Sequence, residues 1–228
     1  MFQQWRLRKR CQSLTRQCNQ ASLLPYIEAC AGLDVDTLVS TPLISVDLEL
    51  TGLDATQNHI IAIGWTQVNQ GRIQFGSNQH IMVNAQQSVG NSAAIHEMTD
   101  AEVASGVPLE TGLKTLFEAA KGRVWLFHHA GLDVAFLKRA CLSWAGVSPP
   151  FAVLDTLQME LAMRRRRDQP VMQGDLQLGT LRSRYNLPRY TAHNALIDAF
   201  ATAELILAIA SRMDPSGALR LRPHIKQY

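Results

Sequence analysis

Cysteines and long hydrophobic runs are both scarce in this sequence. The 228 residues include 4 cysteines, and no two of them form a Cys-x-x-Cys pair. Neither a zinc cluster nor a disulfide framework is indicated, which favours a reducing, cytoplasmic setting. The longest apolar stretch, Leu205 to Ala210, is far shorter than the roughly 20 residues that cross a bilayer, so we expect no membrane partner.

Acidic residues are missing from the first part of the chain. None occurs before Glu28, whereas several basic residues do: Arg6, Arg8, Lys9, Arg10 and Arg16. No apolar core follows this basic start, so the segment is not a secretory signal. We expect residues 1–40 to form a basic helical extension, with an organelle transit peptide as the alternative. A charge run of this kind lies on a phosphate backbone or is simply solvated, and solvation is the default.

The overall composition is that of an ordinary globular protein. The hydrophobic fraction is 46%, the aromatic fraction is 7% and the formal net charge is +3. A chain of this length can bury one α/β core plus a short extension, but not comfortably two full domains. The mild positive charge fits a polyanionic partner without demanding one.

Hydrophobic periodicity predicts three strands with short links, followed by alternating helices and strands. We expect strands at 43–50, 59–68, 72–83, 124–128 and 153–154. We expect helices near 99–102 and at 108–120, 132–145, 156–165, 176–185 and 194–212. The result is an α/β fold, a mixed five-stranded sheet with helices on both faces, in the element order of a ribonuclease H-like fold. We expect this domain to span 41–212 and residues 213–228 to form an irregular tail.

Two carboxylates interrupt the first predicted strand. Asp47 and Glu49 are two residues apart, so both side chains point to the same face. Adjacent anions repel and are costly to desolvate, and hard oxygen ligands of this kind suit Mg²⁺ or Mn²⁺. The alternative is an edge strand with one wet face. Apolar residues argue instead for burial on both faces, with one face carrying Val46, Leu48 and Leu50 and the other Ile44.

A third carboxylate begins a predicted helix. Residues 127–133 read FHHAGLD, with a strand that ends at the histidines and a helix that starts near Asp133. The Asp133 carboxylate can point back toward the strand ends, where α/β sheets place their sites. For Asp133 taken alone we prefer the alternative, an acid favoured by the positive end of the helix dipole.

A fourth carboxylate, Asp198, lies near the start of the last predicted helix and follows His193 by five residues. Five helical residues turn about 140° around the axis, so the two side chains cannot share one face if both are helical. They can share a site if His193 lies in the preceding loop. The neighbours of Asp198 are apolar, where a lone acid is expensive. For His193 taken alone, a capping or surface role is the default.

Together these segments resemble the DEDD exonucleases, in the DnaQ-like branch that contains a histidine and includes the ε subunit exonuclease domain of bacterial DNA polymerase III. The resemblance covers roughly residues 43–211 and rests on Asp-x-Glu followed by Thr-Gly, on His-x-Ala-x-x-Asp and on His-x₄-Asp. Residues 94–99 and 155–157 resemble two further family segments. Three residues depart from the usual pattern and bear on substrate preference more than on activity: Leu50, Glu97 and His129.

The resemblance implies a 3′→5′ exonuclease that releases nucleoside 5′-monophosphates from the 3′ end of a nucleic acid, single-stranded DNA first of all. Two divalent cations, Mg²⁺ or Mn²⁺, would be bound by Asp47, Glu49, Asp133 and Asp198. The catalytic residues would be His193 as general base together with Asp47 and Glu49. The residues near the terminal nucleotides would be Thr51, Gly52, Leu53 and His96. Arg164 to Arg167 either follow a phosphate backbone or form a solvated helix end.

Two rival functions remain open at this point. An exoribonuclease of the oligoribonuclease or RNase T type is favoured by residues 47–54, DLELTGLD, whereas His96 favours the ε-like side. The rival from another class is a non-catalytic nucleic-acid-binding subunit with the same fold, and the intact set of acids argues against it. A homodimer, or a polymerase or repair partner bound through residues 1–40, is also open.

Overall fold

The computed structural model describes residues 2–84, 105–191 and 193–228. The strands are β1 (Leu43–Leu50), β2 (Ile60–Asn69), β3 (Arg72–Met82), β4 (Val124–Phe127), β5 (Ala152–Asp155) and β6 (Ile225–Gln227). The helices are α1 (Phe2–Gln17), α2 (Leu24–Ala31), α5 (Leu109–Ala120), α6 (Gly131–Ala145), α7 (Thr156–Arg166), α8 (Leu178–Arg184) and α9 (Ala195–Met213), with 3₁₀ turns η1 (Ala21–Leu23) and η2 (Arg222–His224). The helix expected near 99–102 lies outside the described residues.

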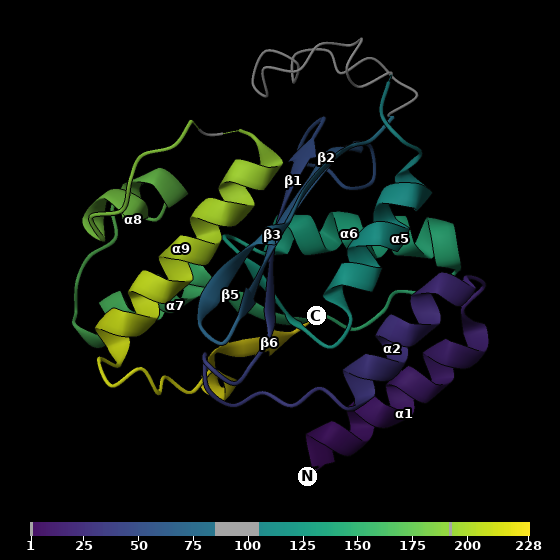
Figure 1. The fold of residues 1–228 in the computed structure, drawn as a ribbon, viewed down its shortest axis with the longest axis horizontal. Coiled ribbons are helices and arrows are strands. Elements are labelled where there is room, and N and C mark those ends of the chain that lie inside the picture. Colours follow the sequence, from purple (N-terminus) through teal and green to yellow (C-terminus); the bar gives the residue numbers. More distant parts are fainter. Residues whose placement is uncertain (1, 85–104, 192) are drawn as a thin grey trace.

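The strands form one mixed sheet with the order β3-β2-β1-β4-β5-β6. The short link between β2 and β3 permits only an antiparallel pair, whereas β4 and β5 each follow a helix, and β4 runs parallel to both β1 and β5. One hydrophobic core includes residues of α2, α5 and α6, and the core on the opposite face includes residues of α7, α8 and α9. Figure 1 shows the sheet between these two layers. The predicted α/β fold with helices on both faces is confirmed.

The prediction of five strands is wrong by one strand within the described residues. Residues 225–227, expected in an irregular tail, form β6 and pair antiparallel with β5. Phe151 and Tyr228 extend this pairing, because each backbone N–H donates to the other residue's carbonyl at 3.4 and 3.0 Å. The strand covers backbone groups that β5 would otherwise leave unpaired at the sheet edge, which a short polar segment does not reveal from its sequence.

The central strand β1 is buried on both faces, although not by the residues that the sequence analysis placed there. Ile44 lies on the same face as Val46, since the two are separated by an even number of residues, so its predicted placement is wrong. The opposite face is buried by Leu43 and Ser45. Asp47 follows on that same face, which is the one that α9 covers.

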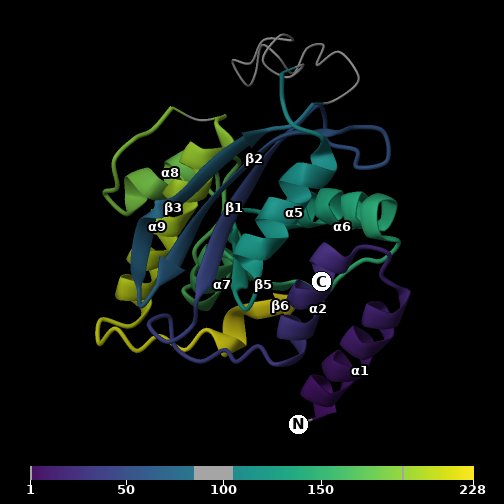
Figure 2. The same ribbon diagram turned by 45° about the vertical axis from the view of Figure 1, so that its right-hand side comes forward.

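The helices expected in residues 1–40 are present as α1 and α2, and they belong to the main core. Leu23, Tyr26 and Ile27 are buried together with Phe117 of α5 and Trp125 of β4. In Figure 2, α1 and α2 lie below α5 and α6 on one side of the sheet. None of the described helices has the length and apolar character needed to span a membrane.

Candidate metal centre and cleft

Two carboxylates project from β1 toward α9. Asp47 is half-buried and pairs in register with Gly64 of β2, while Glu49 is buried opposite Ala62. The alternation of side chains along a strand places both on one face, as predicted. The pairing shifts by one residue between Glu49 and Leu50, so the regular ladder ends directly beside these acids.

Gly64 and Ser45 fix the position of α9 over these carboxylates. A Cβ added to Gly64 would lie 2.1 Å from the carbonyl carbon of Ala195, so only glycine lets the first turn of α9 reach β2. The Ser45 hydroxyl donates a buried hydrogen bond of 2.7 Å to the Ala199 carbonyl. Asp198 lies between these two anchored residues, and the docking therefore directs it toward Asp47.

Asp198 completes a group of three carboxylates. One oxygen from each of Asp47, Glu49 and Asp198 lies within 4.8 Å of the others. His193 occupies the loop before α9, with φ of 70°, and its backbone N–H donates to Oδ2 of Asp198 at 2.8 Å. The structure thus brings His193 and Asp198 together in the arrangement that five-residue spacing permits, with one residue in a loop and the other on a helix.

Asp133 lies beside this group without joining it. It is buried in the first turn of α6, and it raises the pKa of both Asp47 and Glu49 by repulsion. Its own pKa is raised to about 7, mainly by burial, although backbone hydrogen bonds at Asp133 and Leu48 oppose the rise. Asp133 thus belongs to α6, and its charge acts on the carboxylates of Asp47 and Glu49.

Burial and mutual repulsion disfavour the charged forms of these carboxylates. Burial, followed by repulsion from Asp133, Asp198 and Glu49, raises the pKa of Asp47 well above its ordinary value. Burial, followed by repulsion from Asp198 and Asp133, raises the pKa of Glu49 to about 8. Burial also raises the pKa of Asp198, while the backbone hydrogen bond from His193 works against it. Such a group holds its protons or requires a cation.

The oxygen-only donor set fits a divalent cation of the hard class. Three carboxylates that can each supply one oxygen within 4.8 Å of the others match the ligands that Mg²⁺ and Mn²⁺ prefer. A bound cation would also offset the repulsion that raises the pKa values of these carboxylates.

Asp47 and Asp198 line a cleft of about 1010 Å³. One wall comes from α8 and the loop before it, and the other from α9 and the segment that leads to it. The titratable residues of its lining include Asp47, Asp198, His128, His129 and His193. The His128 ring lies 2.7 Å from the Thr156 hydroxyl through Nδ1 and 2.9 Å from the Leu176 carbonyl through Nε2, so it ties the loop wall to the strand ends. Its lining combines polar side chains with apolar ones.

Arg182 connects the two walls, and the sequence analysis did not single it out. Its side chain is 4% exposed, and its guanidinium donates to the carbonyls of Ala201 at 2.6 Å and Pro188 at 2.8 Å. A third bond of 2.7 Å reaches Glu204, and the group lies 4.5 Å from the ring centroid of Tyr190. Arg182 thereby holds the segment before His193 against α9. Arg182 lies between Leu181 and Ser183, with Arg184 two residues on, and this local sequence gives no signal for the role.

Asp155 holds the opposite rim of the cleft. Its carboxylate accepts from the backbone N–H groups of His129 at 3.1 Å and Ala130 at 3.0 Å, directly before α6. It also caps α7 by accepting from Leu157 at 2.9 Å and Gln158 at 3.3 Å. One buried side chain therefore fixes the starts of two helices, including the helix that carries Asp133.

Replacing Asp155 by alanine is expected to lower the free energy of unfolding by about 2–4 kcal/mol, because an N-cap is lost and buried N–H groups lose their acceptor. Urea denaturation measures this change. Glu28→Ala, at an exposed acid on α2, is the matched control and should stay within about 0.5 kcal/mol of the wild type. Equal losses in the two variants would mean that the Asp155 bonds add nothing to stability.

The remaining predicted contact residues are less well placed by the structure. Thr51 begins the loop after β1 and closes it through its hydroxyl, which accepts from the His59 N–H at 2.9 Å. Leu53 is 81% exposed in that loop. Neither residue lines the cleft, and Gly52 does not line it either. His96 lies outside the described residues. Their roles at the terminal nucleotide therefore stay predictions.

A model of the exonuclease family matches residues 44–206. The chain belongs to this exonuclease family. This assignment confirms the resemblance to DnaQ-like exonucleases, and the matched range contains every predicted metal ligand.

Relatives with curated names point the same way. The chain is 30% identical over 174 residues to a PolC-type DNA polymerase III of Caldanaerobacter subterraneus, covering 75% of this chain and 12% of that protein. It is 28% identical over 187 residues to a DNA polymerase III subunit epsilon-like protein of Rhodobacter capsulatus, covering 79% and 26%. The exonuclease chain thus spans about an eighth and a quarter of these relatives.

A solved structure has the same fold. Pop2p of S. pombe, in a form with Mg²⁺ and Mn²⁺ bound, superposes with a TM-score of 0.62 at 16% identity, covering 81% of this chain and 88% of that chain. At this level of identity the similarity shows the fold of the exonuclease chain.

Proposed function

We propose that this chain is a 3′→5′ exonuclease that hydrolyses the last phosphodiester bond of a nucleic-acid strand, with single-stranded DNA as its main substrate. The observation that carries the proposal is the group of three carboxylate oxygens within 4.8 Å of one another, with the His193 backbone N–H donating to the Asp198 carboxylate at the edge of a cleft. The names of the relatives support DNA, since both are DNA polymerase III proteins.

Each site residue has a role in this proposal. Asp47, Glu49 and Asp198 would hold one divalent cation, and Asp133 together with Asp47 would help to hold a second, directly or through a water. Two such cations, when bound, stabilise the attacking and the leaving oxygen of the reaction. The ligand chemistry supports Mg²⁺ or Mn²⁺, the two cations bound in the structurally similar Pop2p.

His193 acts as the general base. Its imidazole takes a proton from the attacking water while a bond forms between the water oxygen and phosphorus. The bond from phosphorus to the 3′ oxygen of the preceding nucleotide breaks. That oxygen gains a proton from water, so a nucleoside 5′-monophosphate leaves and the strand keeps a new 3′-hydroxyl. Arg182 holds the segment before His193 and so positions this base.

A substrate panel tests the proposal. The purified chain with Mn²⁺ should shorten a 5′-labelled single-stranded DNA stepwise and release nucleoside 5′-monophosphates, and it should act more slowly on short RNA. Faster cleavage of short RNA would assign the chain to the oligoribonuclease type. Internal cuts would contradict the exonuclease mechanism, and binding without any cleavage under either cation would indicate a non-catalytic subunit.

A further inference from the structure

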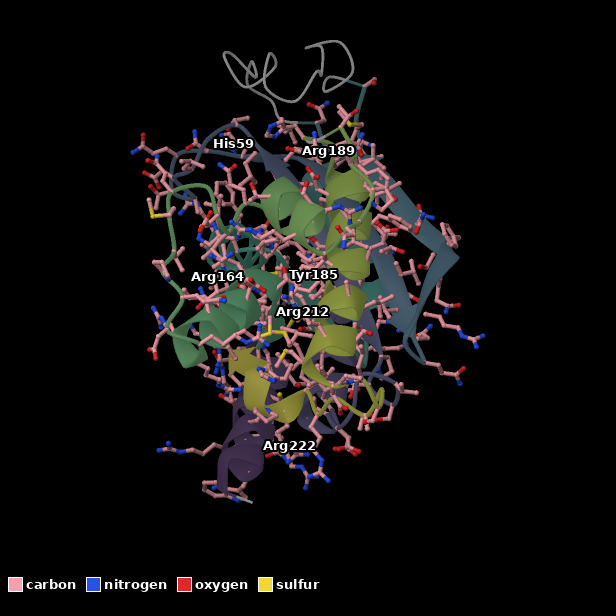
Figure 3. All side chains as sticks on the ribbon, turned by 90° about the vertical axis from the view of Figure 1, so that its left-hand side faces the viewer. His59, Arg164, Tyr185, Arg189, Arg212 and Arg222 are labelled. Carbon is pink, nitrogen blue, oxygen red and sulfur yellow. The ribbon has the colours of Figure 1, made fainter. Side chains whose placement is uncertain are left out.

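A second, smaller pocket lies on the other side of α8 from the cleft. Its volume is about 260 Å³, and it lies among the ends of α7, α8 and α9. Its charged and aromatic lining consists of Glu160, Arg164, Arg167, Arg184, Tyr185 and Arg212. Figure 3 shows Arg164, Tyr185 and Arg212 on the face that α9 crosses, with Arg189 of the cleft further toward the start of that helix.

One wall of this pocket is a fixed ion-pair network. Arg164, with 11% of its side chain exposed, contacts Glu160 at 3.1 Å and Asp175 at 3.0 Å. The second Glu160 oxygen accepts from the Tyr185 hydroxyl at 2.8 Å, and Arg184 contacts Asp175 at 2.6 Å. Both carboxylates are therefore occupied inside the wall. They hold Arg164 and Arg184 in place without neutralising the rest of the pocket.

Two arginines remain available to a ligand. Arg167 and Arg212 are exposed, and no carboxylate in the described part of the chain forms an ion pair with either. The Arg212 guanidinium lies 5.3 Å from the ring centroid of Tyr185. Arginine near a helix C-terminus also offsets the helix dipole, which is the purely structural explanation. The adjacent Arg165 and Arg166 add further positive charge to the same helix end.

The pocket adjoins the cleft through shared elements. Ser183 lines the cleft and Arg184 lines the pocket. Asp175 bonds to Arg164 and Arg184 of the pocket, while Leu176, the next residue, lines the cleft. A strand that left the cleft across α8 would therefore reach the pocket next.

We infer that the pocket binds a backbone phosphate of the nucleic-acid strand whose 3′ end occupies the cleft. The planar fork of arginine matches the geometry of a phosphate, and four arginines line the pocket, of which Arg167 and Arg212 have no carboxylate partner among the described residues. The inference rests on the proposed function only for the position of the strand end. A free phosphate shares the same chemistry, and the path from the cleft favours the phosphate of the strand.

The test compares salt dependence in an inactive background. The Asp47→Asn chain and the same chain with Arg167→Gln and Arg212→Gln bind a labelled single-stranded DNA of about 20 nucleotides over a series of salt concentrations. The two glutamine substitutions should weaken binding about tenfold at low salt and reduce the slope of log affinity against log salt by about 0.7–1.4. Binding of a dinucleotide, too short to reach the pocket, should not change.

Control variants separate charge at this pocket from charge in general. Arg72→Gln with Arg220→Gln removes two exposed arginines that line neither the cleft nor the pocket. This control pair should leave the slope of log affinity against log salt unchanged. Arg167→Lys with Arg212→Lys keeps the charge and should keep most of the slope. An unchanged slope in the glutamine pair, or an equal decrease in the control pair, would overturn the inference.

Two further results separate the alternatives. If inorganic phosphate raises the melting temperature through these arginines while the slope stays constant, the pocket binds free phosphate and the assignment to the strand is overturned. Binding is measured without cleavage. A chain that shows the expected slope but never hydrolyses DNA would therefore contradict the proposed function and leave this inference standing.

Discussion

Asp47→Asn is expected to reduce kcat/KM on single-stranded DNA by at least about a thousandfold, because loss of cation binding removes several kcal/mol of transition-state stabilisation. Asp47, Glu49 and Asp198 form one group, with one oxygen from each within 4.8 Å of the others. Asparagine keeps the shape of the side chain but not its charge. Rates with Mn²⁺ under single-turnover conditions measure the effect on the chemical step.

Asp54→Asn is the matched control for this variant. Asp54 follows β1 by a few residues, but it is exposed and accepts from the Thr56 N–H at 2.8 Å within its own loop. Its replacement should leave kcat/KM within a factor of about two. Comparable losses in the two variants, or an active Asp47→Asn chain, would contradict the assignment of Asp47 to the metal centre.

The residues of the site could be predicted because their signals are local. The period of two along β1 places Asp47 and Glu49 on one face without knowledge of the fold. The five-residue spacing of His193 and Asp198 requires one of them to lie off the helix, and the structure has His193 in the loop. These placements depend on neighbouring residues and backbone geometry, whereas the assignment of the four acids and His193 to one site came from the resemblance to DnaQ-like exonucleases.

The supports of the site could not be predicted, because they join distant segments. Gly64 reads as an ordinary glycine in a strand, yet it permits the contact between β2 and Ala195. Arg182 gains its role from carbonyls on two other segments. β6 exists because β5 offers it an open edge, and its own short polar sequence gives no strand signal. In each case the partner, rather than the local sequence, decides the conformation.

The wrong placement of Ile44 shows a different limit. Burial on both faces of β1 was inferred correctly, but the residue chosen for the second face was wrong. Ser45 provides part of that burial, and a serine rarely counts as a core residue in a hydrophobic pattern. Its hydroxyl is satisfied by the Ala199 carbonyl, a bond that only the docked helix supplies.

Removal of divalent cations is expected to abolish hydrolysis and to destabilise the fold in a pH-dependent way. Burial and mutual repulsion raise the pKa of Glu49 to about 8 and of Asp133 to about 7. Carboxyl groups in the unfolded chain titrate near pH 4, so between about pH 4 and pH 8 the metal-free folded state binds more protons than the unfolded state. The stability of the metal-free protein contributed by these groups therefore falls as pH rises through that range.

A bound cation should reverse this trend. Ligand carboxylates must lose their protons to bind it, so affinity rises with pH, and a cation at a hundred times its Kd adds about 2.7 kcal/mol. The increase in melting temperature on adding Mn²⁺ should accordingly be larger near pH 8 than near pH 6. Thermal unfolding in chelator and in Mn²⁺ at both pH values measures it. Asp47→Asn should lose most of the increase, whereas a pH-independent increase, or one that persists in Asp47→Asn, would place the cation elsewhere.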